Sequence, residues 1–273
     1  MEAQMKLEHE IDFHWLILFA LPTIFSSIFA NLYTTVDGIF VAQWGQHGRP
    51  FRHQHHPAHD VSFLRAGHHV RHWRQRAGGQ EDRRGTDAGS DGVASLTIIW
   101  YAQGLFGGLF RGYINGIASV VSYNLGRGDK ARLSRLFRIS VWTLGIAAAV
   151  ITAASYLFGG AVVGVFAKGN AHVTTIALHG FRIAAVSFLM MAYNIFASGW
   201  FTALNDGKTS AILSFCRTMV FMVIPVLVLP RFFEMDGVWM ALAAGEIPSI
   251  AMSIYYFIKY RAMWQTPKAS AAG

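Results

Sequence analysis

Six long apolar runs dominate this chain of 273 residues. They lie at about 14–44, 96–125, 136–166, 174–204, 209–229 and 238–260. A helix needs about 20 apolar residues to cross the roughly 30 Å hydrocarbon core of a bilayer. Only 14% of the residues are charged, against about 25% in soluble proteins. The runs therefore predict an all-α fold, a polytopic membrane helix bundle with about six transmembrane helices.

Basic residues in the loops orient this predicted bundle. One side holds the basic loop at 127–138 and, after the last run, Lys259 and Arg261, whereas the opposite loops hold only Lys168 and Arg231. Loops rich in lysine and arginine stay in the cytoplasm. We therefore expect a multi-pass protein of the cell (inner) membrane with both termini cytoplasmic. Because the positive charge follows this pattern, it does not favour a nucleic-acid partner.

Residues 47–93 differ from everything around them. This block holds eight of the 12 histidines, eight arginines and no lysine. His68 and His72 are one helical turn apart, and His53, His55 and His56 are clustered. Such groups could bind zinc or nickel, but no cysteine supports them and the arginines would repel a cation. The block can be interpreted as a metal-binding loop, as a polyanion-binding loop or as a segment translated in the wrong reading frame.

Three segments resemble the multidrug and toxic compound extrusion (MATE) family of cation-coupled efflux transporters. They are LPTIFSSIFANLYTTVDGIFVAQWG at 21–45, GYINGIASVVSYNLGRGDKARLSRLFR at 112–138 and HGFRIAAVSFLMMAYNIFASGWFTALNDGKTS at 179–210. The family has twelve helices in two six-helix bundles. The resemblance implies that this chain carries helix 1 and helices 8–12, with no counterpart of helices 3–7. It also implies antiport, in which a proton or sodium ion enters as an organic cation or other toxic compound leaves.

The family's second helix would fall where the anomalous block lies. If HQHHPAHD at 53–60 is read one base later, permitted codons give INIILPMT, and the following codons permit an apolar span with a basic glycine-rich end. This span echoes NGIASVVSYNLGRG at 115–128, as an internal repeat should. We infer a frameshift near Gln46, with the normal frame resuming near Ser95. The hypothesis fails if the DNA holds no apolar frame there.

Polar residues inside the apolar runs are the candidate site. Asp37 lies in the first run, where a carboxylate costs about 2.5–3.5 kcal/mol and usually marks an ion or proton path; alternatively it lies near the membrane interface. Glu246 lies in the sixth run, two residues before Pro248. The proline frees a backbone carbonyl nearby, which suits a cation or a basic drug. The alternative for Glu246 is a structural hydrogen bond to another helix.

Three uncharged polar residues complete the candidates for binding the substrate or the coupling ion. They are Asn194 and Tyr193 in the fourth run and Gln103 in the second. They could line a polar cavity, but buried amides in membrane helices often only join helices. Arg111, near the middle of the second run, could pair with Glu246 or Asp37, or could signal a damaged helix.

Small residues in the second run predict close helix packing. Gly104, Gly107, Gly108, Gly112 and Gly116 recur at three- to four-residue spacing. Small side chains on one helical face let two membrane helices approach closely. We therefore expect this stripe to be a packing surface and not a ligand site.

These observations divide the chain into four parts and favour a transporter over an enzyme. The parts are an N-terminal tail and first helix at 1–45, the anomalous segment at 46–95, a five-helix bundle at 96–262 and a disordered tail at 263–273. The expected partners are the lipid bilayer and small organic cations or other toxic compounds. The sequence predicts no cofactor besides the coupling ion and leaves the oligomeric state open. The alternatives are a non-functional gene fragment or a membrane protein with a histidine-rich metal-binding loop.

Overall fold

The long apolar runs fold into one bundle of helices. The structure, a computed structural model, describes residues 11–44, 82–166 and 171–265. The helices are α2 (Phe13–Trp44), α4 (Asp82–Gly126), α5 (Lys130–Phe166), α6 (Ala171–Ala203), α7 (Gly207–Phe215), the π-helical turn η1 (Cys216–Val220), α8 (Val223–Val228), α9 (Pro230–Lys259) and the 3₁₀ turn η2 (Arg261–Met263). Within these residues, six helical segments are long and apolar enough to cross a membrane. The predicted all-α membrane bundle is confirmed.

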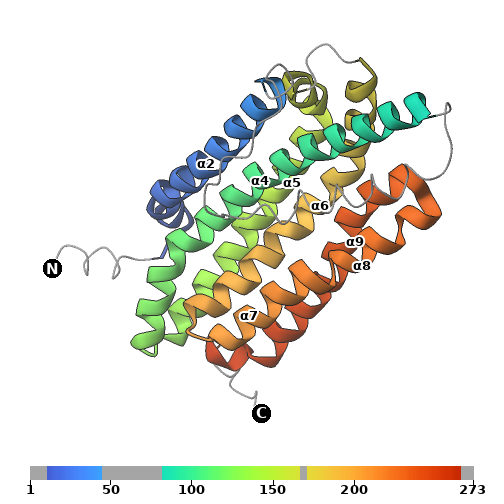
Figure 1. The fold of residues 1–273 in the computed structure, drawn as a ribbon. Coiled ribbons are helices and arrows are strands. Elements are labelled where there is room, and N and C mark those ends of the chain that lie inside the picture. The colour runs from blue at the N-terminus through green and yellow to red at the C-terminus, as the bar shows by residue number, and fades with distance from the viewer. Residues whose placement is uncertain (1–10, 45–81, 167–170, 266–273) are drawn as a thin grey trace, which may run out of the picture.

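Helix α6 is the centre of the bundle. It packs against α4, α5 and α9, and α2 packs on the outer side of α4. Figure 1 shows the long helices running side by side, with α2 and the α8–α9 pair on opposite sides in this view. Much of the core comes from α6, whose buried side chains include Phe181, Phe188, Phe196, Trp200 and Phe201. A helix apolar on nearly every side is expected at the centre of such a bundle.

Several helix boundaries differ from the prediction. Helix α4 begins at Asp82, inside the segment predicted to be anomalous up to residue 95. The fifth run, predicted as one span over 209–229, is divided into α7, η1 and α8. The π-helical turn accommodates one extra residue, which interrupts the helix there. Helix α9 begins at Pro230 and kinks at Glu234, whose φ is 48°.

The glycine stripe of α4 packs closely on α2, as the sequence predicts. A Cβ atom at Gly112 would lie 2.6 Å from the Cα atom of Ile24, and one at Gly116 would lie 2.7 Å from the Cα atom of Ala20. Neither position has room for a side chain, so the two helix backbones meet along this line. Gly104 and Gly107 are the exceptions: a Cβ atom at Gly104 would make only an ordinary 3.8 Å contact with the Asn31 side chain, and the atoms nearest to one at Gly107 belong to Arg111 on its own helix.

An aromatic cluster joins the ends of three helices to the segment after α9. Its members are Phe137 of α5, Phe196, Trp200 and Phe201 of α6, Phe257 of α9, and Trp264. Trp264 is fully buried, and its ring centroid lies 5.3 Å from that of Phe137. The disordered tail predicted to begin at residue 263 is therefore wrong at its start. The rest of that tail, from residue 266, lies outside the described residues.

Candidate functional site

Glu246 and Asn194, both predicted site residues, meet between α9 and α6. The Asn194 amide donates two hydrogen bonds, one to Oε2 of Glu246 at 2.6 Å and one to the Glu246 carbonyl oxygen at 3.1 Å. The hydroxyl of Ser253 donates to Oδ1 of Asn194 at 3.2 Å. Both Asn194 and Ser253 are buried. These contacts use both amide hydrogens of Asn194 and its oxygen, so its orientation is fixed.

Arg217 is the ionic partner of Glu246. Its Nη2 lies 3.0 Å from Oε1 of Glu246, and its Nε donates to Oε2 at 3.3 Å. This fork-like, two-point contact is the strongest geometry for an arginine and a carboxylate. The Glu246 side chain is only 13% exposed and that of Arg217 27%. The two groups neutralise each other in the interior, where a lone charge would be costly.

The local backbone brings Arg217 to the carboxylate. Arg217 lies in the π-helical turn η1, which is closed by the 2.8 Å hydrogen bond from the Phe221 N–H to the Cys216 carbonyl oxygen. A Cβ atom at Gly245 would lie 2.7 Å from the Phe221 carbonyl oxygen. A glycine beside Glu246 therefore lets α9 approach the π-helical turn closely. Such turns occur often at functional sites.

Arg217 was not among the residues selected from the sequence. Of the possibilities left open for Arg111, the pairing with Glu246 is not observed, because Arg217 forms the ion pair. Arg111 instead donates to Oδ1 of Asn31 on α2 at 3.4 Å. Arg217 could have been found from the sequence, since it is a cation inside the fifth apolar run and intramembrane charges usually mark partners or paths.

The other predicted site residues lie elsewhere. Gln103 donates to Oγ of Ser187 at 3.2 Å and so joins α4 to α6. Tyr193 turns its hydroxyl towards Gly145 of α5, where a Cβ atom would collide with it. Asp37 belongs to α2, but its side chain lies outside the described part of the structure. Of the five candidates, the structure therefore brings only Glu246 and Asn194 together.

The described residues contain no group of three or more His, Cys, Asp or Glu side chains that could hold a metal ion. The histidines of the anomalous block, from His47 to His72, lie outside the described ranges. His179 and Asp236 form a 3.0 Å contact between α6 and α9, with both side chains more than half exposed. This pair joins the two helices at the surface.

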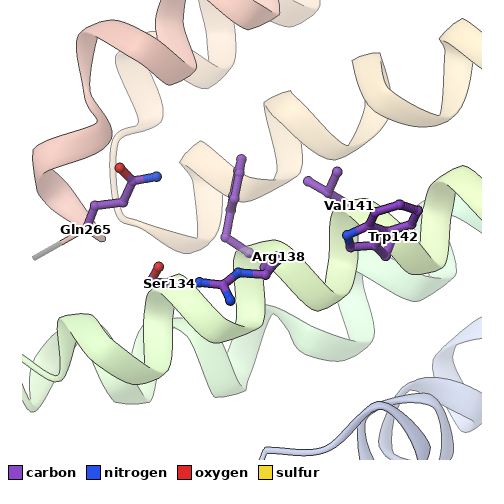
Figure 2. A pocket seen from close by; sticks show the side chains of 6 residues that line it. Ser134, Arg138, Val141, Trp142 and Gln265 are labelled. Carbon is purple, nitrogen blue, oxygen red and sulfur yellow. The ribbon is translucent and has the colours of Figure 1, made fainter.

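A separate pocket of about 240 Å³ lies along the first turns of α5. Figure 2 shows Ser134, Arg138, Val141 and Trp142 of α5 lining it together with Gln265. None of the predicted site residues lines this pocket, so it is distinct from the Glu246 cluster.

Comparison with known proteins decides the family. The sequence profile of the MatE family matches residues 86–228. The chain belongs to the MatE family. The match runs from α4 to α8, and it includes Asn194 and Arg217. The family suggested by the sequence resemblance is confirmed.

Curated relatives of this MatE chain are multidrug exporters from Staphylococcus aureus. The multidrug export protein MepA of strain bovine RF122 / ET3-1 is 24% identical over 156 residues, which is 56% of this chain and 34% of the relative. MepA of strain COL is 23% identical over the same length. The MatE chain thus spans about a third of the length of these relatives.

Solved structures show that the fold is that of MATE transporters. An outward-facing multidrug resistance MATE transporter of the MOP superfamily matches with a TM-score of 0.57 and 20% identity, over 64% of this chain and 40% of that one. A MOP superfamily transporter from Pyrococcus furiosus matches with a TM-score of 0.57 and 19% identity, over 66% and 41%. The helix bundle of this MatE chain therefore corresponds to part of a larger transporter.

Proposed function

We propose that this MatE chain is part of a cation-coupled antiporter that exports organic cations or other toxic compounds. The coupling ion is a proton or sodium ion, and the membrane is the cell (inner) membrane, with both termini in the cytoplasm. The MatE profile, the multidrug exporters among its relatives and the six apolar helices support this proposal.

The observation that carries the proposal is the Glu246 carboxylate between membrane helices. A carboxylate in such a bundle is costly and usually lies on an ion or substrate path. Asn194 fixes the orientation of the carboxylate through the 2.6 Å hydrogen bond to Oε2. We assign to Glu246 the binding of the exported cation or the coupling ion.

Arg217 has a specific role in this proposal. It occupies both oxygens of Glu246, at 3.0 and 3.3 Å. An incoming cation must therefore compete with the guanidinium group for the same carboxylate. Loss of the Arg217 charge should strengthen cation binding, whereas loss of the Glu246 charge should weaken it.

Binding of tetraphenylphosphonium to the full chain in nanodiscs tests this assignment. We expect Glu246→Gln to weaken binding by about tenfold or more, since it removes the charged partner of the cation. We expect Arg217→Gln to tighten binding. Glu246→Asp keeps the charge and should retain measurable binding.

Glu234→Gln is the matched control, because Glu234 is an exposed glutamate on the same helix, α9. It should leave the affinity unchanged. Size-exclusion chromatography identifies any variant that fails to fold. Equal affinities for the Glu246→Gln and Glu234→Gln proteins would contradict the assignment of Glu246.

We further propose that this chain does not transport on its own. Alternating access requires two halves that rock about a central site. The chain spans 34% of the length of its MepA relative, and by resemblance it carries five helices of one half and one of the other. Asp37, on α2, is then the carboxylate contributed by the half that is mostly missing.

A further inference from the structure

The pocket along α5 has a polar end and an apolar end. Figure 2 shows Ser134, Arg138 and Gln265 grouped at one end, and Val141 and Trp142 at the other. Its volume is about 240 Å³, below the roughly 300–1,000 Å³ of pockets that enclose drug-sized ligands. The pocket therefore suits a small polar group attached to an apolar body.

The wall that Gln265 contributes is held in place. Trp264, the preceding residue, is buried in the aromatic cluster. Lys130 Nζ donates to the Ala262 carbonyl oxygen at 2.9 Å, which ties the segment after α9 to the start of α5. The pocket is thus built by two elements fixed to each other and not by a loose chain end.

The polar end of the pocket is positively charged. Arg138 is exposed and makes no ion pair or hydrogen bond with the residues that the structure describes. It ends a stretch, 127–138, with five basic residues and one acidic residue, Asp129. That acid is already 3.6 Å from Arg132. The guanidinium group of Arg138 is therefore positioned for an external anion.

An apolar stripe continues from the pocket along α5. Trp142, Ile146 and Val150 follow Arg138 at four-residue intervals, so they lie on the same side of the helix. Their exposed fractions are 66%, 54% and 61%. In a membrane helix such a stripe faces acyl chains, and tryptophan favours the level of the head groups. Along the helix, a charged side chain, an indole and aliphatic side chains follow one another. This order matches the charged head group, the interfacial region and the acyl chains of a phospholipid.

We propose that this pocket binds the head group of an anionic phospholipid. Arg138 pairs with the phosphate, and Ser134 and Gln265 hydrogen-bond to head-group oxygens. The acyl chains lie along Trp142, Ile146 and Val150. Basic pockets beside membrane helices bind anionic head groups in this way.

Native mass spectrometry of the full chain, titrated with dioleoylphosphatidylglycerol or dioleoylphosphatidylcholine, tests the proposal. The wild type should bind the anionic lipid more tightly than the zwitterionic one. Arg138→Gln should weaken binding of the anionic lipid about fivefold, the loss expected for one basic side chain at the membrane surface. Arg138→Lys should keep most of the affinity.

Arg182→Gln is the matched control, since Arg182 is an exposed arginine of α6 and does not line the pocket. It should leave lipid binding unchanged. Inorganic phosphate at the same concentration should not displace the lipid. Equal losses for Arg138→Gln and Arg182→Gln, or equal affinity for the two lipids, would overturn the proposal. Displacement by phosphate would show a site for free anions and would also overturn it.

Discussion

At the scale of residues, the central feature is a carboxylate that has two partners inside the bundle. Glu246 accepts hydrogen bonds from both Arg217 and Asn194. A buried ion pair contributes little net stability, because desolvation offsets most of the attraction. Removing one member is nevertheless costly, because the other charge is left without a partner. The pair should therefore behave as a unit in stability measurements.

A double-mutant cycle tests this coupling. We expect Arg217→Gln to lower the free energy of unfolding by about 2 kcal/mol, less than for a fully buried pair because both side chains keep some exposure. Arg217→Gln combined with Glu246→Gln should recover part of that loss, since no unpaired charge remains. Unfolding in mixed micelles with increasing sodium dodecyl sulfate measures the differences. Strictly additive effects would show that the two side chains do not interact.

At the scale of elements, helix α4 packs closely on α2 because the glycines along the contact line have no side chains. The contact line follows Gly108, Gly112 and Gly116, where added Cβ atoms would meet α2. Lipid tails are as apolar as leucine, so the association of membrane helices depends on such close packing. A glycine also allows close packing at position 245, where α9 approaches the π-helical turn.

Gly112→Ala should weaken the contact between α2 and α4. The added methyl group would lie 2.6 Å from the Cα atom of Ile24 and 2.8 Å from the carbonyl oxygen of Thr23. Backbone atoms cannot rotate away from the methyl group as a side chain can. We therefore expect the free energy of unfolding to fall by about 1–3 kcal/mol. Thermal unfolding of the purified chain, followed by circular dichroism, measures the change.

Gly160→Ala is the control for that substitution. Gly160 lies in α5, and a Cβ atom there would meet nothing within 4 Å. Alanine is also the better helix former by about 1 kcal/mol. The stability of this variant should stay the same or rise. Similar losses at the two glycines would show that close packing on α2 is not the cause.

At the scale of the whole molecule, the bundle corresponds to part of a transporter. The chain covers 40% of an outward-facing MATE transporter and 34% of its MepA relative. Rocking of two halves is what carries a substrate across a membrane in such folds. The chain belongs to the family and has helices long enough to cross a membrane. Family membership alone, however, does not establish that this chain transports a substrate.

Expression in a bacterium deleted for its efflux pumps tests transport by the chain alone. Under the proposal that the chain does not transport on its own, we expect no change in the inhibitory concentration of organic cations. The Staphylococcus aureus protein MepA, expressed in parallel, should raise that concentration. Immunoblots of membrane fractions verify that this chain is present. Lowered drug susceptibility would contradict the proposed inactivity.

The site was only partly predictable from the sequence. Glu246 and Asn194 could be selected because polar side chains inside apolar runs are rare and costly. Tyr193 adjoins Asn194 in the sequence but faces α5, since adjacent residues of a helix point in different directions. Arg217 was not connected with Glu246, because the two are 29 residues apart and only the packing of η1 against α9 joins them.

The sequence alone was enough to predict the all-α membrane fold and the glycine stripe that packs on α2, because helix length and the spacing of apolar and small residues need no knowledge of distant contacts. The family was predicted from the resemblance of three segments. That Arg217 pairs with Glu246 and that Trp264 is buried, where a disordered tail was predicted, could be seen in the folded structure alone. Both depend on contacts between segments far apart in the chain, and a single tryptophan in a polar tail leaves no periodic pattern from which its burial could be predicted.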